Sequence, residues 1–177
     1  MRRAILLLLL SLAGCGYHSE IRSETTSPDR MIAIPIFENA TFEPLLEKRV
    51  SESFKETFLR RGWQVVARAD QSPLLLSGRV VRFDRTPLSL NRNSQAQEYR
   101  ITIGLEYTFL TKGNNPPKQK DHAEASADYI ASPDPLADRV AEDRAIREAG
   151  LHLAERVSDL RSVAPLSTSP SNGAAGQ

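Results

Sequence analysis

The chain has 177 residues, 40% of them hydrophobic, and its 23 basic and 22 acidic side chains give a formal net charge of +1. This length suits one compact domain with tails, and the near-balance of charge excludes a broad electrostatic attraction for nucleic acid. The single cysteine, Cys15, excludes an internal disulfide, so the hydrophobic core must stabilise the domain.

The start of the chain has the pattern of a secretory signal. Two arginines open it, residues 4–10 are apolar, and Leu12-Ala13-Gly14 leads into Cys15. The apolar run is far shorter than the roughly 20 residues that a membrane-spanning helix needs. The order Leu-Ala-Gly-Cys resembles the bacterial lipobox, in which the cysteine is diacylated and becomes the new N-terminus. We therefore predict a signal peptide at residues 1–14 and an N-acyl diacylglycerol lipid on Cys15. The alternative is an ordinary signal peptide with a chance cysteine.

Cleavage at this point would leave a tether, a domain and a tail. Loss of the two arginines brings the basic residues from 23 to 21 against 22 acidic ones, a net charge of −1. Because two or three acyl chains hold a protein on a membrane essentially permanently, the mature chain needs no hydrophobic segment of its own. We predict a polar tether at residues 15–30, a domain at 31–162 and a disordered tail at 163–177.

The domain begins with an apolar run and a helix. Residues 31–37 are nearly all apolar, which predicts a strand buried on both faces, at a sheet edge or broken at its proline. Asn39 or Thr41 is then available to cap a helix that begins at Pro44 and ends before Gly62. Its core-facing stripe is formed by Leu46, Val50, Phe54 and Phe58, widened by Leu45 and Thr57.

Three further strands follow this helix. Residues 74–83 predict a strand with a bulge at Ser77-Gly78, and a polar loop at 86–97 separates it from the strictly alternating strand at 99–109. The last strand, at 123–129, has a thin inner face rich in alanine. The period of two predicts that one face of the sheet packs and that the other is wet.

A second helix completes the fold. Asp134 caps it and Pro135 opens it, and the small Ala149-Gly150 pair would let its backbone approach the sheet closely. Its predicted stripe consists of Leu136, Val140, Ile146, Ala149, Leu153, Val157 and Leu160. A short extended piece at residues 63–66 follows the first helix. A right-handed crossover makes the first two strands parallel. The sequence thus predicts an α/β (α+β) fold, a two-layer sandwich with two helices on one face of a four-stranded mixed sheet.

No pattern in the chain points to catalysis. The three histidines are dispersed, and no G-x-S-x-G elbow, Gly-rich phosphate loop or metal-ligand spacing is present in the sequence, so we expect neither an enzyme nor a metal or cofactor site. The polar sheet face around Gly104 is either bathed in solvent or set against another polar wall, such as the lumen of a β-barrel. Five arginines fall on or beside it and could form forked bonds with phosphates or carboxylates: Arg79, Arg82, Arg85, Arg92 and Arg100.

Three parts of the chain carry a resemblance to a known family. They are Cys15-Gly16-Tyr17-His18 after the lipobox, the stretch Ile32-Ala33-Ile34-Pro35 … Asn39-Ala40-Thr41 … Pro44-Leu45, and Arg92-Asn93-Ser94-Gln95-Ala96-Gln97-Glu98-Tyr99. Together they resemble the LptE family of outer-membrane lipopolysaccharide-assembly lipoproteins. The resemblance extends from the lipobox to about Arg161, with the same order and spacing of elements.

The resemblance implies a lipid-anchored plug on the periplasmic side of the outer membrane, bound 1:1 inside the LptD β-barrel. It would support assembly of that barrel and transport of lipopolysaccharide to the outer leaflet. The implied contact with lipopolysaccharide is Arg92, with Arg139 as a second candidate early in the last helix. The first part of the domain also resembles other envelope lipoproteins. The alternative is therefore a periplasmic binding module that docks on a peptidoglycan synthase or a secretion complex.

Overall fold

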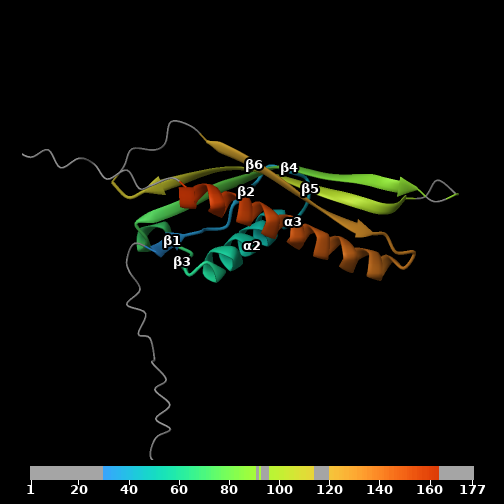
Figure 1. Cartoon of the computed structure of the whole chain (residues 1–177), viewed down its shortest axis with the longest axis horizontal. Helices are drawn as coiled ribbons and strands as arrows, with labels where there is room; N and C mark the ends of the chain where they lie inside the picture. Colours follow the sequence, from blue (N-terminus) through green and yellow to red (C-terminus); the bar gives the residue numbers. More distant parts are fainter. Residues whose placement is uncertain (1–29, 91, 93–95, 114–119, 164–177) are drawn as a thin grey trace, which may run out of the picture.

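The structure is a computed structural model that describes residues 30–90, 92, 96–113 and 120–163. Six strands form one mixed sheet, and two helices cover one of its faces (Figure 1). The order across the sheet is β3-β1-β4-β5-β6, with β2 paired to β4 beside this path. In chain order the elements are β1 (Met31–Ala33), β2 (Glu38–Asn39), α2 (Leu46–Arg60), β3 (Gln64–Val66), the 3-10 helix η2 (Ala69–Gln71), β4 (Leu74–Leu90), β5 (Ala96–Thr111), β6 (Asp121–Ile130) and α3 (Pro135–Val163). The predicted two-layer α/β sandwich is confirmed.

The sheet has two more strands than the four predicted. The first apolar run is broken after β1, and its continuation pairs again as the two-residue β2, so the predicted break at its proline is confirmed. Both strands run parallel to β4, and the extended piece after α2 becomes β3, parallel to β1. Strands of two or three residues contain too little alternation for a period to reveal them, which is why the predicted count is wrong.

The β4–β5 hairpin is longer than predicted. β4 continues to Leu90 and β5 begins at Ala96, so most of the stretch predicted as a loop at 86–97 is strand. The two strands pair up to Leu90 opposite Ala96. Pairing between the two segments stabilises strands whose own side chains do not alternate. Pro87 has no main-chain N–H, and a strand tolerates this loss on a side that is an edge of the sheet.

The bulge lies elsewhere than predicted. The register of β4 against β5 shifts between Val80 and Arg82, not at Ser77-Gly78. Gly78 has another role, because the ring of Phe37 lies 3.0 Å from where its Cβ would be. Gly78 therefore marks the close approach of the Phe37 ring and not a bulge. Nothing in the sequence predicted the bulge between Val80 and Arg82.

Helix α2 places its predicted stripe in the core. The buried members are Leu46, Val50, Phe54, Thr57 and Phe58. Gly62 follows the helix with φ +78°, as predicted for the residue after a helix end. The predicted cap is wrong: Leu45, 61% exposed, is the N-cap residue with φ 61°, and no side chain caps the helix. Asn39 instead donates to the carbonyl of Glu43, at 2.8 Å.

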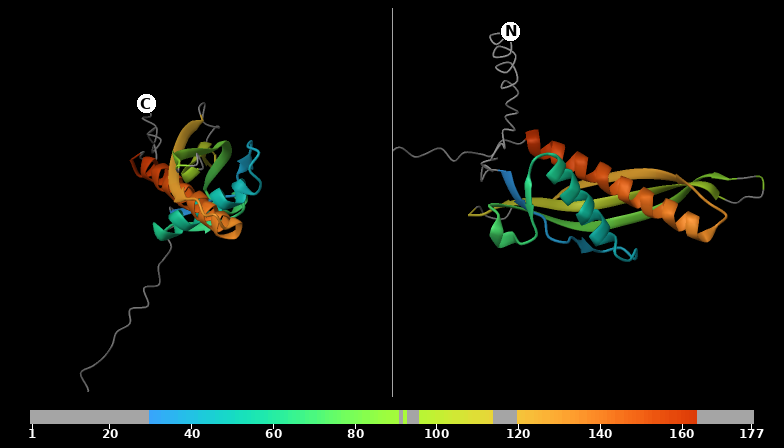
Figure 2. Two further views of the ribbon diagram at one scale, coloured as in Figure 1. Left: turned by 90° about the vertical axis from the view of Figure 1, so that its right-hand side faces the viewer. Right: turned by 90° about the horizontal axis from the view of Figure 1, so that it is seen from below.

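Helix α3 begins as predicted, since the N–H of Leu136 donates to Oδ1 of Asp134 at 3.0 Å. Ile146, Ala149, Leu153 and Val157 of its predicted stripe are buried, whereas Leu136, Val140 and Leu160 are exposed. A stripe predicted from the helix period assumes that the whole helix packs on the core. However, α3 is much longer than α2 and extends past it (Figure 2). Gly150 approaches α2 and not the sheet, because its Cβ would lie 2.7 Å from Oγ of Ser53. Within the described residues, no helix is long and apolar enough to cross a membrane.

Different segments of the chain lie at the two ends of the sheet. The chain enters the domain at β1, beside Leu75 of β4, which we call the entry end. The turn of the β4–β5 hairpin lies beyond Leu90, about 50 Å away at 3.3 Å per residue (Figure 1). Helix α3 begins at this second end, which we call the hairpin end.

Candidate functional site

The turn of the hairpin carries Arg92, the residue that the sequence singled out. Arg92 is exposed and lies in a turn between β4 and β5. No salt bridge joins it to any other residue that the structure describes, whereas Arg79, Arg82, Arg85 and Arg100 are each paired with a carboxylate. Among the described residues, Arg92 thus differs from these four arginines, whose charges are compensated within the protein.

Arg139, the second candidate, lies in the first turns of α3 at the same end of the molecule (Figure 1). Its side chain is 65% exposed, and Nη1 lies 3.9 Å from Oε2 of Glu142. The fold thus brings the two basic candidates to the hairpin end from segments far apart in the sequence.

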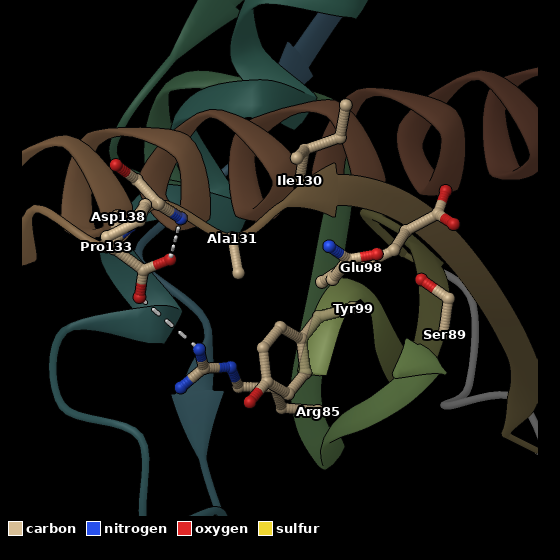
Figure 3. Close-up of a pocket in the computed structure, with 10 residues that line it drawn as sticks. Arg85, Ser89, Glu98, Tyr99, Ile130, Ala131, Pro133 and Asp138 are labelled. Carbon is tan, nitrogen blue, oxygen red and sulfur yellow. Dashed lines mark hydrogen bonds and ion pairs between the residues drawn. The ribbon is translucent and has the colours of Figure 1, made fainter. Parts of the chain in front are cut away.

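A groove of about 970 Å³ separates the hairpin from the start of α3. Its walls come from β4, β5, the end of β6 and the first turn of α3, and both polar and apolar side chains line it (Figure 3). No single segment of the sequence contains enough of these residues to have predicted the groove.

Arg85 crosses this groove at its base. Its guanidinium lies 4.0 Å from the ring centroid of Tyr99, and Nη2 lies 3.5 Å from Oδ2 of Asp138 (Figure 3). Nε lies 3.8 Å from Oε1 of Glu142, which is only 13% exposed. Arg85 therefore connects the hairpin to α3 with its charge compensated, and it is not a free phosphate contact.

The bulge explains why Arg85 faces the helices. Arg85 lies opposite Ile101, whose side chain is buried in the core. Without the extra residue between Val80 and Arg82, alternation would place Arg85 on the same face as Arg79, toward the polar side. A one-residue shift in register, which the sequence does not indicate, therefore determines on which face of the sheet Arg85 lies.

Behind the half-buried Tyr99, which lines the groove, lies the buried ring of Tyr129. Tyr129 stacks on Tyr99 with ring centroids 5.5 Å apart, and none of the described residues forms a hydrogen bond with its hydroxyl. Burial raises the pKa of Tyr129 to about 12, although the charge of Arg85 acts in the opposite direction. The tyrosine therefore stays neutral over the physiological range.

The outer face of the sheet is polar, with charges paired in place. Arg100 forms a fork with Asp128, with distances of 2.7 Å from Nε to Oδ1 and 2.8 Å from Nη2 to Oδ2. This bond lowers the pKa of Asp128 from its usual value. Arg79 lies 3.9 Å from Glu38. Arg100 therefore forms its fork with one of the protein's own carboxylates, and Arg79 is paired with another.

Gly104 allows a longer ion pair across the middle of this face. Arg82 pairs with Asp84 on its own strand and reaches Oε1 of Glu124 on β6 at 3.1 Å. A Cβ on Gly104 would lie 2.9 Å from Cβ of Arg82 and 3.3 Å from Oε1 of Glu124. Hydrogen bonds from Arg82 and His122 lower the pKa of Glu124. The centre of the face is thus flat, polar and internally compensated.

The remaining predicted sites have simpler outcomes. Cys15 lies outside the described residues, so the lipid prediction remains a prediction. Across the described part of the chain, no group of three or more His, Cys, Asp or Glu side chains is placed to hold a metal ion. His152 is exposed on α3, with Nδ1 3.3 Å from the carbonyl oxygen of Ser126.

Comparison with known proteins decides the family. The family model of LptE, described as lipopolysaccharide-assembly, matches residues 30–159. The chain belongs to the LptE family. The predicted family is therefore confirmed, and the match covers almost all of the described domain. No curated protein matches the chain.

Solved structures share the LptE-like fold of this chain at low sequence identity. Rare lipoprotein B from Shewanella oneidensis is 16% identical, with a TM-score of 0.50 over 75% of this chain and 93% of that chain. A hypothetical protein from Chlamydia trachomatis is 10% identical, with a TM-score of 0.51 over 74% of this chain and 94% of that chain. At these identities the likeness establishes the fold alone.

Proposed function

We propose that this LptE-family chain is a non-enzymatic outer-membrane lipoprotein that fills the lumen of the LptD β-barrel in a 1:1 complex. In this role it assists assembly of the barrel and the transport of lipopolysaccharide to the outer leaflet. The observation that carries the proposal is the family match over residues 30–159, joined to the position of Arg92 at the turn of a hairpin far from the entry end.

The lipid on Cys15 would hold the entry end near the inner leaflet of the outer membrane, on the periplasmic side. The fifteen residues between Cys15 and Met31 span at most about 50 Å when fully extended. Since the hairpin end lies opposite the entry end, the hairpin would then point away from the tether and toward the interior of the barrel.

The outer face of the sheet suits a polar wall. The interior of an outer-membrane barrel is polar. The charges of Arg82 and Arg100 are already compensated by Glu124 and Asp128. Placing this face against the barrel wall would therefore bury these arginines as ion pairs and not as unpaired charges.

At the hairpin end, Arg92 would meet lipopolysaccharide phosphates. A guanidinium forms forked, charge-assisted bonds with phosphate oxygens, which are stronger than neutral hydrogen bonds. Arg139 would be the second contact, because its guanidinium is 65% exposed and its ion pair with Glu142 is long, at 3.9 Å. Glu142 would then remain paired with Arg85.

We expect Arg92→Glu to weaken lipopolysaccharide binding roughly tenfold or more, since a hydrogen bond to a charged group contributes about 1.5–3 kcal/mol. Binding of lipopolysaccharide to the purified domain measures this. Arg68→Glu is the matched control, because Arg68 is an exposed arginine near the entry end whose ion pair in the described residues is with the exposed Asp70. Equal binding by the Arg92 and Arg68 variants would discard the role of Arg92.

The partner is tested by isolating the full-length chain from outer membranes in detergent. We expect a large barrel protein in equal amounts, and we expect Cys15→Ser to abolish membrane attachment. Recovery of a peptidoglycan synthase or a secretion complex in place of the barrel would favour the alternative docking role.

A further inference from the structure

One edge of the sheet is open near the start of helix α2. β5 pairs along one side of β4. On the other side β2 pairs with β4 only as far as Val80, where the N–H of Ala40 donates to the Val80 carbonyl at 2.9 Å. Beyond Val80, no described strand pairs with this side of β4. After the bulge, the main-chain groups of alternate β4 residues therefore face outward, while those of the residues between them pair with β5.

The other long edge is not open in the same way. β6 ends the sheet, but side chains of α3 contact two of its carbonyl groups. Nη1 of Arg156 donates to the carbonyl of Glu124 at 2.8 Å, and Nδ1 of His152 lies 3.3 Å from the carbonyl oxygen of Ser126. An unprotected edge invites a further strand, so covering β6 while leaving β4 open directs strand addition to β4.

An aromatic side chain stands beside the open edge. Phe42, between β2 and α2, has a relative exposure of 107%, the value of a fully solvated side chain. A pocket of about 380 Å³ lies between this loop and β4, with Phe42, Val81 and Phe83 among its lining residues. We call this place the Phe42 corner.

The loop that presents Phe42 is held by hydrogen bonds. The N–H and Oγ1 of Thr41 bond to Oδ1 of Asn39 at 2.9 and 2.7 Å. Nδ2 of Asn39 donates to the carbonyl of Glu43 and to Oε2 of Glu47, at 2.8 and 2.9 Å. A loop fixed in this way loses little conformational freedom when a partner binds.

The same loop stores backbone strain. Leu45 has φ 61°, a left-handed conformation that is unfavourable for leucine, and its side chain is 61% exposed. Such strain persists only where the surrounding structure enforces it, and it is concentrated at binding sites. Leu45 is thus held in a strained and exposed position in the same loop as the exposed Phe42.

We propose that the Phe42 corner docks an extended segment of the barrel-forming partner, an inference that rests on the proposed function. The segment adds as a strand along β4 where β2 ends and packs an apolar side chain against Phe42. An extended chain fits because its regularly spaced main-chain donors and acceptors can pair with the whole row of outward-facing groups on an open edge. Pro87 has no N–H, so it ends the added strand before the tip of the hairpin.

Photo-crosslinking in intact cells tests the proposal. Benzoylphenylalanine replaces Phe42 in the full-length chain, and the matched control carries it in place of Leu59, a 56% exposed residue of α2. We expect an adduct with the barrel protein from position 42, mapped to a single extended segment, and none from position 59. Co-purification of the barrel without an adduct from position 42 would overturn the proposal and leave the proposed function standing, as would an adduct between two copies of this chain. Absence of any barrel protein would overturn both.

A second variant separates docking from folding. Because Phe42 is fully exposed, Phe42→Ala should leave the thermal unfolding midpoint unchanged while weakening association with the barrel roughly tenfold or more, as for an anchor side chain. Leu59→Ala should change neither quantity. Association of the Phe42 variant at wild-type strength would contradict the proposal.

Discussion

The two halves of the sheet are built by different means. In the entry half, apolar side chains of the strands and α2 are fully buried, among them Ile32, Leu76 and Phe54. In the hairpin half, Leu88 and Leu90 are exposed, and the charged Arg85 occupies a helix-facing position. Stability is therefore concentrated at the entry end, and the hairpin end presents side chains on a scaffold held by a few specific contacts.

The largest expected effect comes from a substitution that disrupts the core of the entry half. Phe54→Asp places an unpaired charge at a fully buried position and should cost about 3–5 kcal/mol in the free energy of unfolding. Urea unfolding measures it, with Phe42→Asp as the matched control because the same change occurs at a fully exposed ring. If the Phe54 variant unfolds like wild type, the core does not lie where the structure places it.

A smaller effect is expected where the hairpin half meets α3. Arg85→Ala removes the contact with the Tyr99 ring and two ion pairs, at a cost of about 1–2 kcal/mol. Hydrogen exchange should become faster in the hairpin while the entry half remains protected. Arg100→Ala, which loses only an exposed fork on the other face, should leave the hairpin less affected. Equal acceleration across both halves would show that they do not unfold separately.

The smallest effect concerns acid pH and the outer face. Because Arg100 lowers the pKa of Asp128 in the folded state, this pair stabilises the fold above the unfolded pKa of about 3.9. The stabilisation is lost as the pH falls through the lower, folded value. Thermal unfolding midpoints should therefore fall more steeply below pH 4 for wild type than for Asp128→Asn. Parallel curves would mean that the exposed pair contributes nothing.

The elements with strong local periods could be predicted from the sequence. The α2 stripe of Val50, Phe54 and Phe58 and the inward face of β5, including Ile101 and Ile103, are buried as expected. A helix period or a strand alternation is a property of neighbouring residues, so it survives any tertiary arrangement that buries one side. The candidate Arg92 also came from the sequence, through its resemblance to a family.

The errors occur where distant segments act on each other. The hairpin extends to Leu90 because β5 pairs with it, and Leu136 is exposed because α3 extends past its neighbours. None of these partners is indicated by the residues next to the position concerned.

The sequence by itself determined the LptE family, the two helices and the division of the central strand into an apolar and a polar face. Only the tertiary structure decided that Arg85 turns toward α3, that Arg92 and Arg139 share one end, and that the edge beside Phe42 is open. The physical reason is that side-chain periods are set along the chain. The side of a residue beyond a bulge and the pairing of an edge depend on contacts between segments far apart in it.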